Sequence, residues 1–168
     1  MTSQASGLSK SRSRRQAPRP PIHLLAEESD LVADLAIAAE HKLPVVAAML
    51  LEEIERAELH SPADMPPGHV RLNSRVTFYD EKSRRAREVQ LVLPATANIA
   101  EGRISVLTPV GAALFGLGDG ACISWPDLDG NERPIRIMRV DAPSDEGALP
   151  DGLRPSPRPS DGREAMLP

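Results

Sequence analysis

The side chains that could bind a metal ion or form a reactive thiol are sparse in this sequence. His60, Asp64 and His69 stand near one another, and both residue types are ligands of Zn²⁺. Because no second dense pair of ligands accompanies them, the spacing predicts no metal site, and we expect no cofactor. The single cysteine, Cys122, excludes an internal disulfide. Its place in the apolar run 121–125 predicts a buried, inert thiol.

The segment 40–43, Glu-His-Lys-Leu, combines one acid with two basic residue types. Hydrolysis assisted by Mg²⁺ needs paired carboxylates, because a single oxygen ligand holds the ion weakly. Glu40 stands alone here, and the ammonium of Lys42 opposes the excess negative charge that such a site requires. Phosphate-binding glycine loops, nucleophile elbows and metal motifs do not occur elsewhere. The sequence therefore predicts no catalytic residue and no enzyme.

Two helices should position this segment. Apolar residues recur at helical spacing over 29–41 and again over 44–57, where Pro44 suits the first helical position. Two arms joined by so short a segment predict an antiparallel helical hairpin within residues 22–61. Each arm would be about 21 Å long at roughly 1.5 Å per residue. Periodicity alone favours a hairpin that buries its apolar stripe against a domain.

A sheet should follow the proline-rich linker 62–68. Alternating apolar residues predict four or five antiparallel strands around 76–78, 89–93, 104–106, 121–125 and 135–140. A bulge near Met138 would explain the change of parity in the last of these. Thr108 and Pro109 are suited to the N-cap and first position of one short helix, and Gly116 is placed to end it. The predicted fold class is α+β.

Composition limits the classes of partner that the chain is expected to bind. A net charge of −4 argues against a chain that coats nucleic acid along its whole length. Residues 1–21 are rich in Arg, Ser and Pro and predict a disordered basic arm with weak nucleic-acid contact. An organelle transit peptide is the alternative for this segment, although it would need an apolar helix face. Residues 143–168 predict a disordered tail. We expect a cytoplasmic monomer with no membrane segment, because no apolar run approaches about 18 residues.

Two runs of residues carry a family resemblance. They are Asn73-Ser74-Arg75-Val76 with Phe78, and Ser105-Val106 followed by Pro109-Val110-Gly111-Ala112-Ala113-Leu114, Gly116-Leu117, Gly120, Ile123 and Trp125. Over about residues 22–141 the chain resembles the regulator of nucleoside diphosphate kinase family, which is similar to the Gre transcript-cleavage factors in its carboxy-terminal domain. Three positions depart from the family pattern, namely Thr108, Phe115 and Ala121.

The resemblance implies a fold and a partner. It implies that 69–142 form an FKBP-like domain and that the hairpin is a short coiled coil directed at the secondary channel of RNA polymerase. The implied channel tip is Glu40, His41, Lys42 and Leu43, and the implied polymerase docking loop is Leu107, Thr108 and Pro109. Because the acid pair of the cleavage factors is missing, the chain is expected to regulate transcription without cleaving transcripts. The family name does not imply kinase activity.

Two alternatives remain open from the sequence. An FKBP-like fold also suits a prolyl isomerase or chaperone, which would need an aromatic-walled pocket. Fold by itself does not confer that function. Phe78, Tyr79, Phe115 and Trp125 are the aromatic residues that this chain offers for such a pocket. The other alternative is an interaction module whose partner is not polymerase.

Overall fold

The computed structural model describes residues 19–127 and 129–143. The basic arm and the tail that the sequence predicts lie almost wholly outside the described residues. The elements follow the order β1 (His23–Leu25), α1 (Ala26–Ala39), α2 (Pro44–Glu55), β2 (Glu58–His60), β3 (Arg75–Asp80), β4 (Arg85–Val92), β5 (Arg103–Ser105), α3 (Pro109–Leu114), β6 (Cys122–Pro126) and β7 (Glu132–Asp141). Short 3-10 turns occur at Pro94–Thr96 and Ile99–Glu101. Among the described residues, no helix has the length and apolarity needed to cross a membrane.

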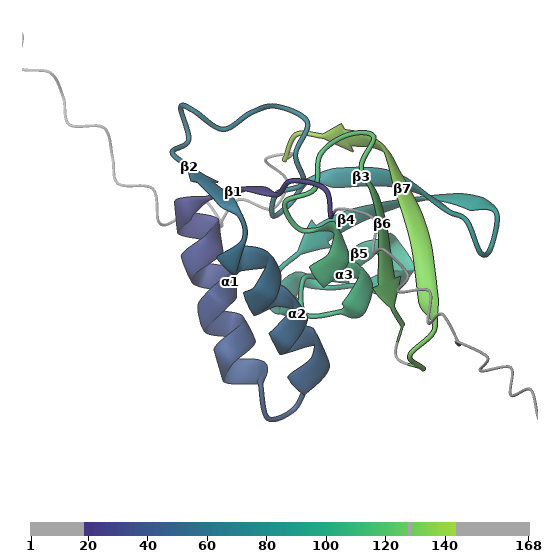
Figure 1. Cartoon of the computed structure of the whole chain (residues 1–168), viewed down its shortest axis with the longest axis horizontal. Coiled ribbons are helices and arrows are strands. Elements are labelled where there is room, and N and C mark those ends of the chain that lie inside the picture. Colours follow the sequence, from purple (N-terminus) through teal and green to yellow (C-terminus); the bar gives the residue numbers. More distant parts are fainter. Residues whose placement is uncertain (1–18, 128, 144–168) are drawn as a thin grey trace, which may run out of the picture.

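Helices α1 and α2 lie side by side beside the sheet and are joined by residues 40–43 (Figure 1). Helix α1 begins at Ala26, earlier than the sequence predicts, and carries Glu27 and Glu28 in its first turn. Acids there interact favourably with the positive end of the helix dipole. Helix α2 begins at Pro44 as expected, because proline at the first position loses no helical hydrogen bond.

The larger sheet has the strand order β5-β4-β3-β7-β6 and is mixed rather than antiparallel. Strand β5 pairs with β4 in parallel, Gln90 opposite Arg103 and Val92 opposite Ser105. The expectation of a wholly antiparallel sheet is therefore wrong at this edge. Alternation marks which face of a strand is buried, but it carries no information on strand direction. Here the connection 93–102, with its two 3-10 turns, returns the chain to the level of Gln90, so that β5 runs in the same direction as β4. The FKBP-like description stays a prediction.

The bulge expected near Met138 is confirmed. Thr77 pairs with Arg139 and Phe78 with Ile137, so Met138 has no partner on β3. The extra residue lets Ile137 face the core on one side of the bulge while Val140 still pairs with Val76 on the other.

Cys122 contradicts its prediction, because its side chain is exposed. Strand β6 is an edge strand of the sheet. Its inward positions are taken by Ile123 and Trp125, which are half-buried and pack against the core. Because side chains alternate along a strand, Cys122 points to solvent.

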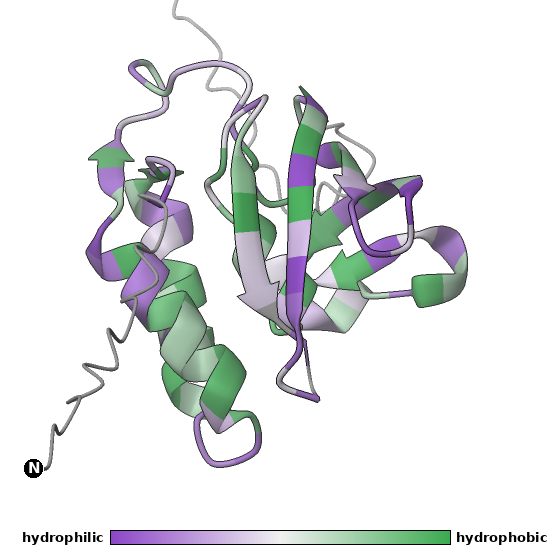
Figure 2. Ribbon diagram, turned by 45° about the vertical axis from the view of Figure 1, so that its right-hand side comes forward, coloured by the Kyte–Doolittle hydropathy of each residue, from purple (hydrophilic) through white to green (hydrophobic). Residues whose placement is uncertain are grey.

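One hydrophobic cluster joins α1 and α2 to the five-stranded sheet and α3, which together we call the sheet unit. Its members include Val32, Ala36, Val46, Ala47 and Leu50 from the helices, and Val76, Phe78, Leu91, Leu114 and Ile137 from the rest of the chain. Helix α2 contacts α3 directly. Figure 2 shows apolar residues along both helices and a hydrophilic loop where they meet. The domain boundaries predicted from the sequence stay a prediction. Because the helices and the sheet share one core, a test of these boundaries must show whether either part folds without the other.

Candidate functional site

The predicted channel tip is an exposed turn at the end of the helical pair that lies away from β1 and β2 (Figure 1). Backbone N–H groups of Lys42 and Leu43 donate to the Ala39 carbonyl oxygen at 2.9 and 2.8 Å, which closes the turn. Glu40 is the one acid within residues 35–51, all of which the structure describes. The geometry therefore offers no pair of carboxylates for a Mg²⁺ ion at this position.

Apolar side chains surround the charged turn. Leu43 is 39% exposed, Ile37 57% and Val45 62%, although each could have been a core residue by type. Single exposed apolar residues are ordinary, but a group of them at one protruding end is typical of a contact surface. We call Ile37, Leu43 and Val45 together with Glu40, His41 and Lys42 the tip surface.

The predicted docking loop is held by a local hydrogen-bond network. The Thr108 hydroxyl donates to the Ser105 carbonyl oxygen at 2.7 Å and accepts from the Gly111 backbone N–H at 3.1 Å. The backbone N–H of Leu107 donates to the Ser105 hydroxyl at 3.0 Å. The N-cap role predicted for Thr108 is confirmed. Leu107, Thr108 and Pro109 are all half-buried, so part of each side chain stays accessible to solvent.

Gly111 is required for that shape. A Cβ atom added to it would lie 2.1 Å from the Ser105 carbonyl oxygen and 2.9 Å from the Thr108 hydroxyl oxygen. Only glycine lets the first turn of α3 pass so close to the preceding strand. The tip surface lies where α1 and α2 are joined, whereas the docking loop precedes α3. The contact between α2 and α3 holds the two regions in one packed structure.

The base of the helical pair is fastened to the sheet unit by polar contacts as well as by the core. The Glu28 carboxylate accepts from the Leu72 backbone N–H and pairs with the Arg71 guanidinium, each at 3.2 Å. The backbone N–H of His23 donates to the Gly116 carbonyl oxygen at 3.1 Å. These contacts fix the β1 end of the helical pair on the sheet unit, and the tip surface lies at the opposite end of the pair.

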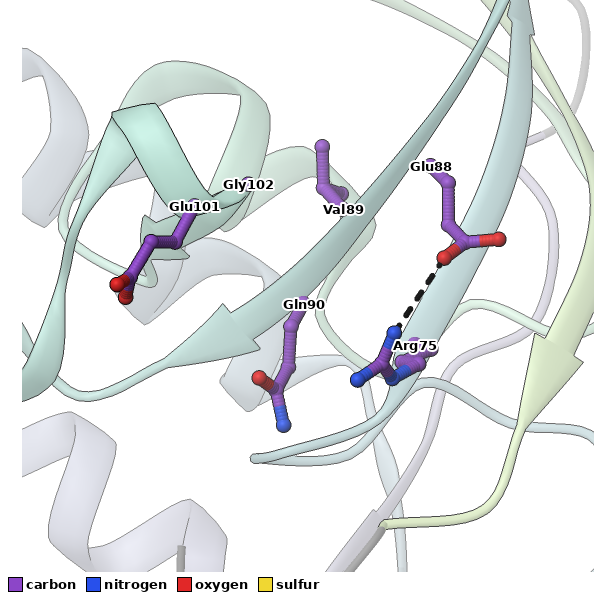
Figure 3. A pocket seen from close by; sticks show the side chains of 6 residues that line it. All are labelled: Arg75, Glu88, Val89, Gln90, Glu101 and Gly102. Carbon is purple, nitrogen blue, oxygen red and sulfur yellow. Dashed lines mark ion pairs between the residues drawn. The ribbon is translucent and has the colours of Figure 1, made fainter. Parts of the chain in front are cut away.

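Two pockets of the described chain differ in volume and in the residues that line them. The one in Figure 3 holds about 50 Å³ and is lined by polar side chains, including Arg75 and Glu88, whose charged groups lie 3.5 Å apart. A space of this size accommodates little more than water. The other holds about 370 Å³ between the Pro20–Pro21 segment and the turn at Gly118–Ala121. Neither is lined by Phe, Tyr or Trp, and Phe78 and Phe115 are buried in the core. These pockets do not support a prolyl isomerase.

Asp80, the last residue of β3, is one of two buried acids among the described residues, the other being Glu53 on α2. Burial opposes the charged form of Asp80. The hydrogen bonds from Ser83 and Lys82 and the positive charge of Arg133 outweigh that effect and hold the pKa of Asp80 below its ordinary value. Backbone N–H groups of Lys82 and Ser83 donate to the carboxylate at 2.9 and 3.2 Å. The structural contacts account for this carboxylate, and it has no part in the tip or the docking loop.

Of the three residues that the sequence suggests for metal binding, His60 and His69 both lie beside His23, whereas Asp64 does not join them. Asp64 accepts from the Ser61 hydroxyl at 2.6 Å and does not join His60. His60 instead meets His23, with 2.8 Å between their ring nitrogens, and Glu58 lies beside both. Sequence reasoning missed this group because His23 precedes His60 by 37 residues. The Glu58-x-His60 spacing, which places both on one face of a strand, is the signal that was available.

Sequence comparison places this fold among known proteins. The family described as "Transcription elongation factor, GreA/GreB, C-term" matches residues 65–142. A protein named "Regulator of nucleoside diphosphate kinase" from Escherichia coli (strain K12) is 42% identical over 126 residues, which cover 73% of this chain and 90% of the relative. This chain belongs to the GreA/GreB family. A "Transcription elongation factor GreA" from Brucella canis is 32% identical and covers 76% of this chain and 85% of its own length.

A solved structure of the family agrees with the fold described above. The "Prokaryotic transcription elongation factor GreA/GreB from Nitrosomonas europaea" is 32% identical with a TM-score of 0.56, and the match covers 73% of this chain and 98% of that one. The resemblance drawn from the two sequence runs is thus confirmed at the level of the family.

Proposed function

We propose that this protein is a non-enzymatic transcription regulator that binds RNA polymerase at or near the secondary channel and does not stimulate transcript cleavage. Membership of the GreA/GreB family supports a role in transcription. The tip surface enters the channel mouth, and Leu107, Thr108 and Pro109 rest on the polymerase rim. Both regions are exposed or half-buried and belong to one packed body.

The observation that carries the proposal is the composition of the tip surface. Its exposed apolar side chains, Ile37, Leu43 and Val45, supply area for a contact. Its single acid, Glu40, stands next to His41 and Lys42. A surface with apolar contact area and no carboxylate pair suits binding without metal-dependent hydrolysis.

The length of the helices points the same way. Helix α1 has 14 residues and α2 has 12. At 1.5 Å per residue these helices are roughly 21 and 18 Å long. Part of that length packs on α3 and the core, so less than the whole projects. A catalytic group misplaced by about 1 Å can lose about a hundredfold in rate. The protein therefore occupies the channel without supplying catalysis.

The test is competition on a backtracked elongation complex. We expect excess protein to slow cleavage driven by a Gre factor and to stimulate none itself. Val45→Asp should weaken binding to core polymerase at least tenfold, because it places a charge in a desolvated contact. Ile99→Asp is the matched control, since Ile99 is 84% exposed and lies far along the chain in a 3-10 turn.

Replacing His41 and Lys42 by Asp and Glu restores paired acids at the tip. We expect this double variant to bind polymerase and still not to cleave. Robust cleavage would show that the tip reaches the catalytic centre and that only the acids were absent. Binding of polymerase with no competition at all would move the docking site away from the channel.

An interaction with nucleoside diphosphate kinase is the second candidate, because the relative at 42% identity is named for regulating that enzyme. Titration of purified kinase with this protein, by calorimetry, tests it directly. Binding to the kinase that survives Val45→Asp would assign the kinase to another surface. Binding lost with Val45→Asp would place both partners on the tip surface and make them competitors.

A further inference from the structure

Three of the four histidines of this chain gather at one place, where the helical pair meets the sheet unit. His23 lies on β1, His60 on β2, and His69 follows the linker. The ring centroid of His23 lies 5.1 Å from that of His60 and 4.5 Å from that of His69. The remaining histidine, His41, is at the tip. His23, His60 and His69, which we call the histidine group, belong neither to the tip surface nor to the docking loop.

The parallel ladder between β1 and β2 brings the ligand atoms together. His23 is the direct partner of Glu58, and His60 follows Glu58 on the same face of β2 because side chains alternate. The Nδ1 atom of His23 lies 2.8 Å from Nε2 of His60, and each of these nitrogens lies 3.8 Å from one carboxylate oxygen of Glu58. The three donor atoms of His23, Glu58 and His60 all lie within 4.8 Å of one another.

We propose that His23, Glu58 and His60 bind a divalent transition-metal ion of the zinc class. Two imidazoles and one carboxylate form a ligand set that Zn²⁺ accepts, with a fourth position left for water or another ligand. Imidazole nitrogens also suit Co²⁺, Ni²⁺ and Cu²⁺, whereas Mg²⁺ requires oxygen ligands.

The geometry needs only small shifts to accept the ion. Ligand atoms about 2.0–2.1 Å from a tetrahedral Zn²⁺ lie about 3.3 Å apart. The two ring nitrogens must therefore separate by about 0.5 Å, and the Glu58 carboxylate must approach by about the same amount. Glu58 can make that movement because its side chain is 69% exposed, whereas the His23 and His60 side chains, 20% and 13% exposed, need only a small rotation of their rings.

His69 supports the site from the sheet side. Its Nδ1 lies 3.1 Å from the Pro67 carbonyl oxygen and 3.3 Å from that of Pro66. Because carbonyl oxygens only accept, the proton of a neutral His69 is on Nδ1. Its Nε2 faces Gly118, where an added Cβ would lie 3.0 Å away. His69 is therefore a positioning residue whose ring packs edge-on against His23.

The surroundings of His23 disfavour a positive charge on its ring. Burial and the neighbouring His69 and His60 lower the pKa of His23, while Glu58 raises it in part. In the contact between His23 and His60, one of the two facing nitrogens carries a proton and donates to the other. Binding of an ion to both nitrogens would move that proton to the far nitrogen of the same ring, which is a change of tautomer.

The site would clamp the base of the helical pair. Strand β1 runs directly into α1, and β2 follows soon after α2. An ion shared by the two strands links both ends of the helical segment and adds to the contacts that fix it on the sheet unit. Metal binding would consequently stabilise the folded chain, since the three ligands are far apart in an unfolded one.

The test uses the full-length protein without an affinity tag, in a Cys122→Ser background that removes the exposed thiol. Calorimetry with Zn²⁺ should give one site per chain. At about a hundredfold excess of ion over the Kd, the melting temperature should rise by about 10 °C. Mg²⁺ should do neither. Co²⁺ should give the visible absorption of a tetrahedral site.

Variants locate the site. His60→Gln should weaken zinc binding at least a hundredfold and abolish the thermal shift. Glu58→Gln, at an exposed position, should fold normally and weaken binding at least tenfold. His41→Ala is the matched control and should bind as the parent does. Zinc binding that is unchanged in both ligand variants, lost in His41→Ala, or absent at about 100 µM in the parent would overturn the proposal.

Discussion

Replacing Gly116 by Ala probes the junction on which the position of the tip depends. Gly116 has φ +79°, a conformation in which an L-residue costs about 1–2 kcal/mol. The added Cβ would lie 2.4 Å from Cγ2 of Ile22 and 2.8 Å from Cδ2 of Leu24. Both side chains are buried, so they can yield only by moving β1 within a packed core. Such overpacking costs about 1–3 kcal/mol. We expect Gly116→Ala to lower the free energy of unfolding by about 2–5 kcal/mol in all.

Gly120→Ala is the control that isolates the backbone part of this cost. Gly120 has φ +76°, and nothing lies within 4 Å of its added Cβ. It should lose only about 1–2 kcal/mol. Urea unfolding followed by circular dichroism measures both variants under the same conditions. If Gly116→Ala proves no more destabilising than Gly120→Ala, β1 does not pack on Gly116 as described, and the fixed base of the helical pair would have to be abandoned.

Three further changes test the core, the docking loop and the buried acid Asp80. Leu50→Ala should cost about 2–5 kcal/mol and shift unfolding seen by Trp125 fluorescence as far as unfolding seen by circular dichroism, because one cluster spans helices and sheet. A shift in the dichroism alone would show that the helices unfold separately. Thr108→Ala should cost about 1 kcal/mol in urea unfolding through loss of the N-cap. Asp80→Asn should cost about 1–3 kcal/mol at pH 7. Because the folded pKa of Asp80 is lowered, its contribution is present above the ordinary pKa of 3.8 and is lost as the pH falls through the lower, folded value. Unfolding curves of parent and variant should therefore converge under acid conditions, and a constant difference would contradict this account.

The short-range features of the fold were predictable because they depend on neighbouring residues. Alternation placed β3, β4 and β7, and Thr108 with Pro109 placed the start of α3. The bulge at Met138 followed from a change of parity within one strand. The composition of the tip was equally legible, since Glu40, His41 and Lys42 are adjacent, and so was family membership, which two runs of residues carried.

Only the tertiary structure decided the features that join distant residues. The direction of β5, the pairing of β1 with β2 and the exposure of Cys122 depend on which strands become neighbours and which become edges. The burial of Val32 and Leu50 in the same core as Ile137 likewise depends on how the helices dock. Alternation and helical period report only that a face is buried, and they do not say against what.

The histidine group shows this division most sharply. The sequence places Asp64 and His69 nearest to His60, but in the structure the ligand atom closest to His60 comes from His23, 37 residues earlier. A ladder of three paired residues, His23 to Leu25 with Glu58 to His60, brings them together. That ladder exists because α1 and α2 return the chain to its starting point. The chemistry of each side chain is a property of the sequence, whereas the distance between two side chains is a property of the path that the folded chain takes.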